Sequence, residues 1–166
     1  MRAIADYDAE IETHSSSLPD YALFAALPGA ASTFAPRLLV AFGEDRERFR
    51  TADELQRYAG VAPVTEQSGN SRWVHWRYKC PTFLRQTFVE WAAQTIPHSF
   101  WAGAFYAQQR ARGASRQSAL RALAFKWVRI LFRCWQDRVA YDESTYLKAL
   151  QKRHFPLLAT AANSIA

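Results

Sequence analysis

A serine in a turn-like segment is the residue of this sequence best suited to covalent chemistry. Ser68 lies in the segment QSGN at 67–70, and a serine hydroxyl becomes a nucleophile when a base or a metal activates it. The same segment suits a plain turn, because the hydroxyl can bond to backbone amides and Gly-Asn tolerates positive φ. It differs from the Gly-x-Ser-x-Gly elbow of hydrolases, and the nearby His75 is equally well explained as a partly packed surface histidine. Taken alone, these residues favour a turn former, with nucleophilic catalysis as the alternative.

The acidic residues do not predict a metal site. Four of them lie on one helix-forming segment, 3–14, and three lie in one charged loop, 43–49. Both groups are explained as solvated surface charge. Phosphoryl transfer with Mg²⁺ needs carboxylates that converge from separate elements, and nothing in the sequence marks such a set. We therefore expect no metal ligands in this chain and no DNA cleavage by the chain alone.

The charge is distributed unevenly along the sequence. Up to Glu66 the chain carries eleven acidic and six basic residues, whereas from Gln67 to Gln136 it carries eleven basic residues and one acid, Glu90. Such a block favours a polyanionic partner, and we expect that partner to be a nucleic acid. Aromatic residues interleaved with the block could stack on unpaired bases: Trp73, Trp76, Tyr78, Phe105 and Tyr106. The alternative is a helical surface whose arginine stems cover the core, with the aromatic rings inside it.

Two groups of basic residues are the candidate nucleic-acid contacts. The first group lies close to Ser68 in the sequence: Arg72, Arg77, Lys79 and Arg85. The second group shares one face of a predicted long helix and would follow a phosphate backbone farther away: Lys126, Arg129 and Arg133.

Apolar periodicity and capping residues predict a mainly α fold that positions these groups. Helices are expected over 3–14, 21–24, 32–42, 51–59, 82–95, 99–112, 115–139 and 143–152. Strand-favouring residues after Ser68 predict a small β-hairpin with Ser68 near its tip. Two short helices around Pro28-Gly29 indicate a helix-hairpin-helix-like N-terminal part, whose turn could offer amides to a phosphate. An ordinary helical hairpin is the alternative.

The overall composition indicates a globular intracellular protein. Of the 166 residues, 49% are hydrophobic, which is enough for a packed core and excludes wholesale disorder. No signal-peptide run and no membrane-length apolar stretch occurs, so we expect a cytoplasmic protein and no membrane partner. Cys80 and Cys134 lack nearby ligands at zinc spacing and are expected to be free thiols.

Several motifs taken in order resemble one family of mobile-element proteins. They are Leu27-Pro28-Gly29, the 37–42 helix, Gly43-Glu44-Asp45, Tyr58 to Pro63, Gln67-Ser68-Gly69, Leu84-Arg85, the break at Gly113, Ser118 to Leu120, Lys126 and Tyr141-Asp142. This pattern resembles the C-terminal domain of insertion-sequence transposases that pair a RuvC-like N-terminal domain with a serine-bearing domain. The resemblance covers most of the chain and rests on order and spacing.

The resemblance implies DNA transposition by a recombinase that some family members guide with a bridge RNA. It implies that Ser68 attacks a DNA phosphodiester and forms a phosphoserine link, while Mg²⁺ is held by the RuvC-like domain. On this interpretation residues 1–17 end a linker or coiled-coil helix, 18–153 form the transposase C-terminal domain, and 154–166 form a tail. The protein would act in the bacterial cytoplasm at the nucleoid, as a homo-oligomer or with a RuvC-like domain supplied in trans.

This chain departs from the family pattern in two places, and two other functions compete with catalysis. Where the family has Gly-Asn before Leu-Arg, this chain has Cys80-Pro81-Thr82-Phe83, and the family's Pro-Gly-x-Gly turn reads Pro28-Gly29-Ala30-Ala31 here. The first alternative function is a non-catalytic helix-hairpin-helix module that only binds DNA or RNA. The second is an inert transposase remnant. The RuvC-like domain and most of the linking helix are expected to lie before Met1.

Overall fold

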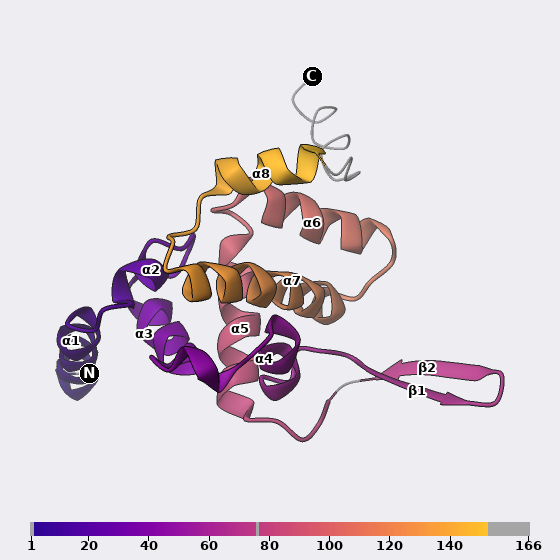
Figure 1. Ribbon diagram of the computed structural model, residues 1–166, viewed down its shortest axis with the longest axis horizontal. Coiled ribbons are helices and arrows are strands. Elements are labelled where there is room, and N and C mark those ends of the chain that lie inside the picture. The colour runs from indigo at the N-terminus through magenta and orange to yellow at the C-terminus, as the bar shows by residue number, and fades with distance from the viewer. Residues whose placement is uncertain (1, 76, 153–166) are drawn as a thin grey trace.

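The computed structural model describes residues 2–75 and 77–152 (Figure 1). As predicted, the fold is mainly α with one small antiparallel β-hairpin. Its elements are α1 (Arg2–Ser16), α2 (Tyr21–Ala25), α3 (Ala31–Phe42), the short 3-10 helix η1 (Arg46–Arg48), α4 (Ala52–Tyr58), β1 (Val64–Ser68), β2 (Ser71–His75), α5 (Thr82–Thr95), α6 (Phe100–Ala111), α7 (Arg116–Asp137) and α8 (Glu143–Lys152). None of the described helices is long and apolar enough to span a membrane. The predicted tail over 154–166 and Trp76 lie outside the described residues.

Side-chain caps start the helices where the sequence predicted them. The Thr51 hydroxyl accepts a hydrogen bond from the Glu54 amide at 3.2 Å, and the Ser115 hydroxyl accepts one from the Ser118 amide at 3.1 Å. The Glu54 carboxylate does not return to the amide of the cap residue, as a capping box would require, but accepts from the Arg50 amide at 2.8 Å. Each cap satisfies a backbone amide that the helix itself leaves unbonded.

Helix α7 lies at the centre of the body and packs against α4, α5 and α6. The apolar face that helical periodicity predicts for this helix packs into the core. Ile130 is partly buried there, and five residues are buried: Leu120, Leu123, Trp127, Leu131 and Trp135. The Trp127 ring lies 4.9 Å from that of Trp91 and 4.6 Å from that of Trp101, measured between centroids. The Trp127 indole nitrogen donates to the Thr95 hydroxyl at 2.9 Å. Aromatic packing of this kind holds the three helices together.

The turn between α2 and α3 packs against α5. The Trp91 indole donates to the Pro28 carbonyl at 3.1 Å, and a Cβ at Gly29 would lie 2.8 Å from the Gln94 carbonyl oxygen. Gly29 is therefore required both for its φ of +66° and for this close approach. Ala31 has a φ of +43°, which is the left-handed region that favours glycine. It stands where the resembling family has the last glycine of Pro-Gly-x-Gly.

Helix α1 lies at the edge of the body beside α2 and α3 (Figure 1). Its apolar side chains face solvent, with exposed fractions of 68% for Ile4, 67% for Tyr7 and 50% for Ile11. The helix predicted over 3–14 is thus present, and within the described residues its apolar side chains are left uncovered.

Candidate functional site

The hairpin that carries Ser68 projects from the helical body (Figure 1). Strands β1 and β2 pair antiparallel from Val64 opposite His75 to Ser68 opposite Ser71. Gly69 opens the connecting turn with a φ of +56°, and no atom lies within 4 Å of where its Cβ would be. Conformation rather than space therefore explains glycine there. Every strand residue is exposed except Val64 and His75 at the root, which are half-buried. Ser68 is thus presented to solvent near the hairpin tip, as predicted.

The register separates Ser68 from Arg72. Residues opposite each other in an antiparallel pair share a face, and successive residues alternate between faces. Ser68 therefore shares a face with Glu66, and Arg72, opposite Gln67, lies on the other face. Arg72 is next to Ser68 in the hairpin but does not approach the hydroxyl from the same side.

Glu66, on the same face of the hairpin as Ser68, contacts two neighbouring aromatic side chains, Trp73 and His75. Glu66 accepts a hydrogen bond from the Trp73 indole nitrogen at 3.0 Å, and its other carboxylate oxygen lies 2.7 Å from His75 Nε2. The bond with His75 and, to a smaller extent, the bond with Trp73 lower the pKa of Glu66 below its ordinary value of 4.5. Glu66 is therefore a carboxylate at neutral pH, engaged by both rings.

His75 is too far from Ser68 to act as its base. Four residue steps separate the root pair, which contains His75, from the pair that contains Ser68, and these span about 13 Å. A general base must lie within hydrogen-bonding distance of the proton that it takes. Within this chain, the hairpin thus presents an exposed hydroxyl without bringing His75 to it.

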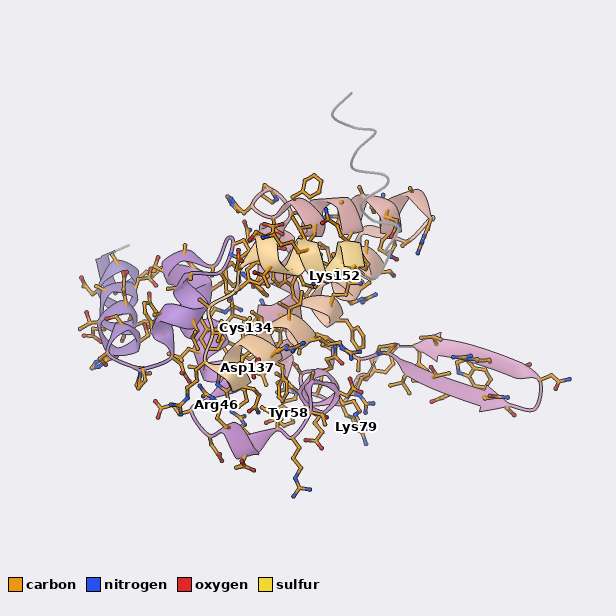
Figure 2. The ribbon with its side chains drawn as sticks, turned by 45° about the horizontal axis from the view of Figure 1, so that its top comes forward. Arg46, Tyr58, Lys79, Cys134, Asp137 and Lys152 are labelled. Carbon is orange, nitrogen blue, oxygen red and sulfur yellow. The ribbon has the colours of Figure 1, made fainter. Side chains whose placement is uncertain are left out.

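Two arginine side chains, Arg85 and Arg121, lie near each other at the root of the hairpin. Arg85 Nη1 donates to the Arg77 carbonyl at 3.3 Å, which ties the loop that follows β2 to α5. The pKa of Arg121, in α7, is lowered mainly by burial of its guanidinium. The nearby positive charge of Arg85 lowers it further, so the two side chains lie close together. Lys79 is exposed in the loop between β2 and α5 (Figure 2). The structure therefore brings the Arg85 side chain to the Arg77 backbone and places Arg121 near Arg85.

A groove runs from the hairpin root along α7 and under α8, and the three predicted α7 cations line it. Lys126, Arg129 and Arg133 contribute to its wall together with Arg121, Val61 and Pro63. Cys134 and Asp137, labelled in Figure 2, belong to the same wall. The predicted common face of Lys126, Arg129 and Arg133 is confirmed. Sequence reasoning missed Arg121, which lines the same groove. Helical periodicity did not point to it, because it lies about 80° around the helix from Arg129 and about 120° from Arg133.

The cations in this groove have different surroundings. Lys126 Nζ lies 4.8 Å from the centre of the Phe105 ring, and burial, with a smaller contribution from Arg129, lowers its pKa. Arg133 and Asp137 form a largely exposed ion pair at 3.7 Å, which contributes little to stability. Phe105 itself is only 5% exposed. The prediction that Phe105 stacks on bases is wrong, because its ring is part of the core; Tyr106 likewise packs against the core.

The other polar groups of the groove are not activated for chemistry. Burial raises the pKa of the Cys134 thiol, and it raises the pKa of the Tyr141 hydroxyl, which accepts a hydrogen bond from the Trp101 indole at 2.7 Å. Both groups stay protonated at neutral pH. Among the described residues, no group of three or more His, Cys, Asp or Glu side chains could hold a metal ion.

Comparison with known proteins places these features in a family. The model of the Transposase IS116/IS110/IS902 family matches residues 21–107, which include the hairpin and Ser68. A mini-circle protein of Streptomyces coelicolor, named as a transposase for IS117, is 32% identical over 143 residues, covering 86% of this chain and 33% of that protein. The insertion element IS110 43.6 kDa protein of the same organism is 32% identical over 145 residues, covering 83% of this chain and 33% of that protein. The insertion element IS900 42 kDa protein of Mycobacterium paratuberculosis is 27% identical over 147 residues, covering 86% and 36%.

This chain spans about a third of the length of these curated relatives. The family model, in contrast, matches just over half of the chain, from α2 into α6. The chain therefore belongs to the IS116/IS110/IS902 family of transposases.

Proposed function

We propose that this chain is the serine-bearing domain of an insertion-sequence transposase and that Ser68 attacks a DNA phosphodiester. The observation that carries the proposal is the exposed position of Ser68 at the tip of a hairpin that projects from the body, inside the region that the family model matches. A nucleophile for DNA must reach a phosphorus in a large substrate, and an extended hairpin gives it that reach. In this proposal residues 18–153 form the domain and 1–17 end a linking helix.

The reaction exchanges one phosphate ester for another. Ser68 Oγ forms a bond to phosphorus, the bond from phosphorus to one deoxyribose oxygen breaks, and the serine proton leaves while the departing oxygen gains one. A serine hydroxyl is a weak nucleophile at neutral pH and needs activation. His75 lies too far from Ser68 to supply that activation as a base. We assign it to a RuvC-like domain that holds Mg²⁺, located elsewhere in the protein or in a partner chain.

The cations provide the binding surface for nucleic acid in this proposal. Arg77, Lys79 and Arg85 at the hairpin root would hold the phosphates nearest Ser68, and Arg72 would contact the backbone from the opposite face of the hairpin. The α7 groove, lined by Lys126, Arg129 and Arg133, would hold a more distant stretch of DNA or a guide RNA through its phosphates. The exposed apolar stripe of α1 supports assembly with another chain.

A second candidate function is binding without catalysis. The basic groove does not depend on Ser68, and α2 and α3 surround a Pro-Gly turn of the kind found in helix-hairpin-helix modules. A module of this type, or an inert remnant that binds nothing, would need no nucleophile. The two proposals differ in whether Ser68 is required for a covalent step.

The test is to trap a covalent protein–DNA adduct. The chain is supplied with a RuvC-like domain, Mg²⁺, any cognate RNA and a labelled DNA end of the element, and the products are denatured before electrophoresis. We expect an adduct with the native chain and with Ser71→Ala, the matched control directly across the hairpin, and none with Ser68→Ala. Salt-sensitive binding without any adduct would support the binding module instead, and an adduct that persists in Ser68→Ala would overturn the assignment of the nucleophile.

A further inference from the structure

Trp73 is a tryptophan whose ring is held at the surface. Four other tryptophans, Trp91, Trp101, Trp127 and Trp135, are at most 1% exposed, whereas Trp73 is 46% exposed on a hairpin that packs against no helix beyond its root. Leaving a large apolar ring in water forgoes the stabilisation that burial would provide. The indole nitrogen of this ring is bonded within the hairpin, and nearly half of the residue's surface is left in solvent.

The hairpin fixes the orientation of that ring. The Trp73 indole nitrogen donates to Glu66 at 3.0 Å, and the same carboxylate is paired with His75 Nε2 at 2.7 Å. His75 in turn is stacked with Tyr78, which is 78% exposed. A ring that is already oriented loses less conformational freedom when a flat partner binds to it.

Trp73 also lies on the Ser68 face. Glu66 is opposite Trp73 and Ser68 is opposite Ser71, so the two pairs lie on one face and are two residues apart along the hairpin, a distance of about 7 Å. This distance is comparable with the reach of one nucleotide from its phosphate to its base. A phosphodiester at Ser68 would therefore have a neighbouring base at the Trp73 ring.

We propose that Trp73 stacks on an unpaired DNA base next to the phosphodiester at Ser68, and that Glu66 is the positioning residue for the ring. Aromatic stacking platforms of this kind bind single strands with little sequence preference, because every base has a flat face. An unpaired base fits better than a paired one, whose faces are covered by neighbours in the duplex. The proposal rests on the proposed function only for the identity of the neighbouring phosphodiester.

The first experiment measures stacking in the chain itself. A short single-stranded oligothymidine with one 2-aminopurine is titrated with the full chain, and the quenching of 2-aminopurine fluorescence reports stacking on an aromatic ring. We expect Trp73→Ala to remove the quenching and to weaken binding about ten-fold. Thr65→Ala, which removes an exposed side chain from the opposite face of the hairpin, should change neither. Quenching that is equal in Trp73→Ala and the native chain would overturn the proposal.

A second comparison separates the base from the phosphate. Replacing the 2-aminopurine nucleotide by an abasic one should weaken binding to the native chain as much as Trp73→Ala does, and the two changes together should add nothing further. Glu66→Ala should lose part of the quenching with Trp73 still present, and Glu66→Gln, which keeps an acceptor for the indole, should restore it. Fully additive losses would overturn the stacking assignment.

The stacking site and the Ser68 nucleophile can fail separately. In the adduct assay, Trp73→Ala should reduce adduct formation on DNA with an unpaired base beside the phosphodiester but not on the abasic equivalent. Trp73-dependent quenching without any Ser68 adduct would leave the stacking site standing and refute the nucleophile. A Ser68 adduct that is equally sensitive to Trp73→Ala on both DNAs would refute the stacking site alone, because the ring would then act through something other than the base.

Discussion

Substituting Gly60 by alanine should destabilise the fold through a collision that the structure defines. Gly60 follows α4 with a φ of +72°, and the Val61 and Ala62 amides both return to the Gln56 carbonyl. An added Cβ would collide with Cys80 Sγ and lie 2.7 Å from Cys80 Cβ. Left-handed backbone in a non-glycine residue costs about 1–2 kcal/mol, and overpacking costs about 1–3 kcal/mol. We expect Gly60→Ala to lower the free energy of unfolding by about 2–5 kcal/mol.

Gly113 provides the matched control for this prediction. Its φ is +84°, and nothing lies within 4 Å of where a Cβ would be, so Gly113→Ala should cost only the backbone contribution of about 1–2 kcal/mol. Urea unfolding followed by circular dichroism gives both values, with the dependence on denaturant unchanged.

A double-mutant cycle then isolates the collision. Cys80→Gly removes both clashing atoms and should recover about 1–3 kcal/mol in the Gly60→Ala background. Cys80→Ala keeps the Cβ and should recover less. Equal losses for Gly60→Ala and Gly113→Ala, or no coupling with Cys80→Gly, would refute the steric argument.

Two further predictions concern the helix termini. Ala31→Gly should raise the free energy of unfolding by about 0.5 kcal/mol, because relief of the left-handed conformation exceeds the extra freedom of glycine in the unfolded chain; a lower urea midpoint would contradict this. The pKa of Asp142 is lowered to about 2 by hydrogen bonds from Thr145 and Ser144 at the start of α8. Since the folded pKa lies below the ordinary value of 3.8, the stabilisation is complete above that pH and is lost as the pH falls towards 2. An NMR titration of the Asp142 carboxyl should show this, and a midpoint near 3.8 would be incompatible with the capping bonds.

The sequence predicted the features that depend on local interactions. The caps at Thr51 and Ser115 are set by residues within three positions of the bond they form, and α8 begins and ends at the predicted residues, Glu143 and Lys152. The apolar stripe of α7 follows from helical periodicity, because a long helix in a small body must bury one face. The hairpin and the position of Ser68 near its tip follow from a glycine turn between strand-favouring segments.

The sequence did not predict which side chains of α6 face the core and which side chains of the hairpin share a face. Nothing local shows that the Phe105 ring is buried, since that depends on how α6 packs against α7. The bonds from Glu66 to Trp73 and His75 cross the hairpin, and they depend on a register that the sequence analysis left unassigned. The same register puts Arg72 on the face away from Ser68. The assignment of Ser68 as a nucleophile remains a prediction from the resemblance.

Because both strands are exposed, the hairpin is attached to the body only at its root, and a small tilt there is amplified at the tip. Ser68 lies about 13 Å beyond the pair that joins the body, so a tilt of about 10° at the root would move the hydroxyl by about 2 Å. A misplacement of about 1 Å can cost a factor of about 100 in rate. Accurate placement of the Ser68 hydroxyl therefore requires a bound partner that holds the outer part of the hairpin. Without that partner the chain should not react with DNA.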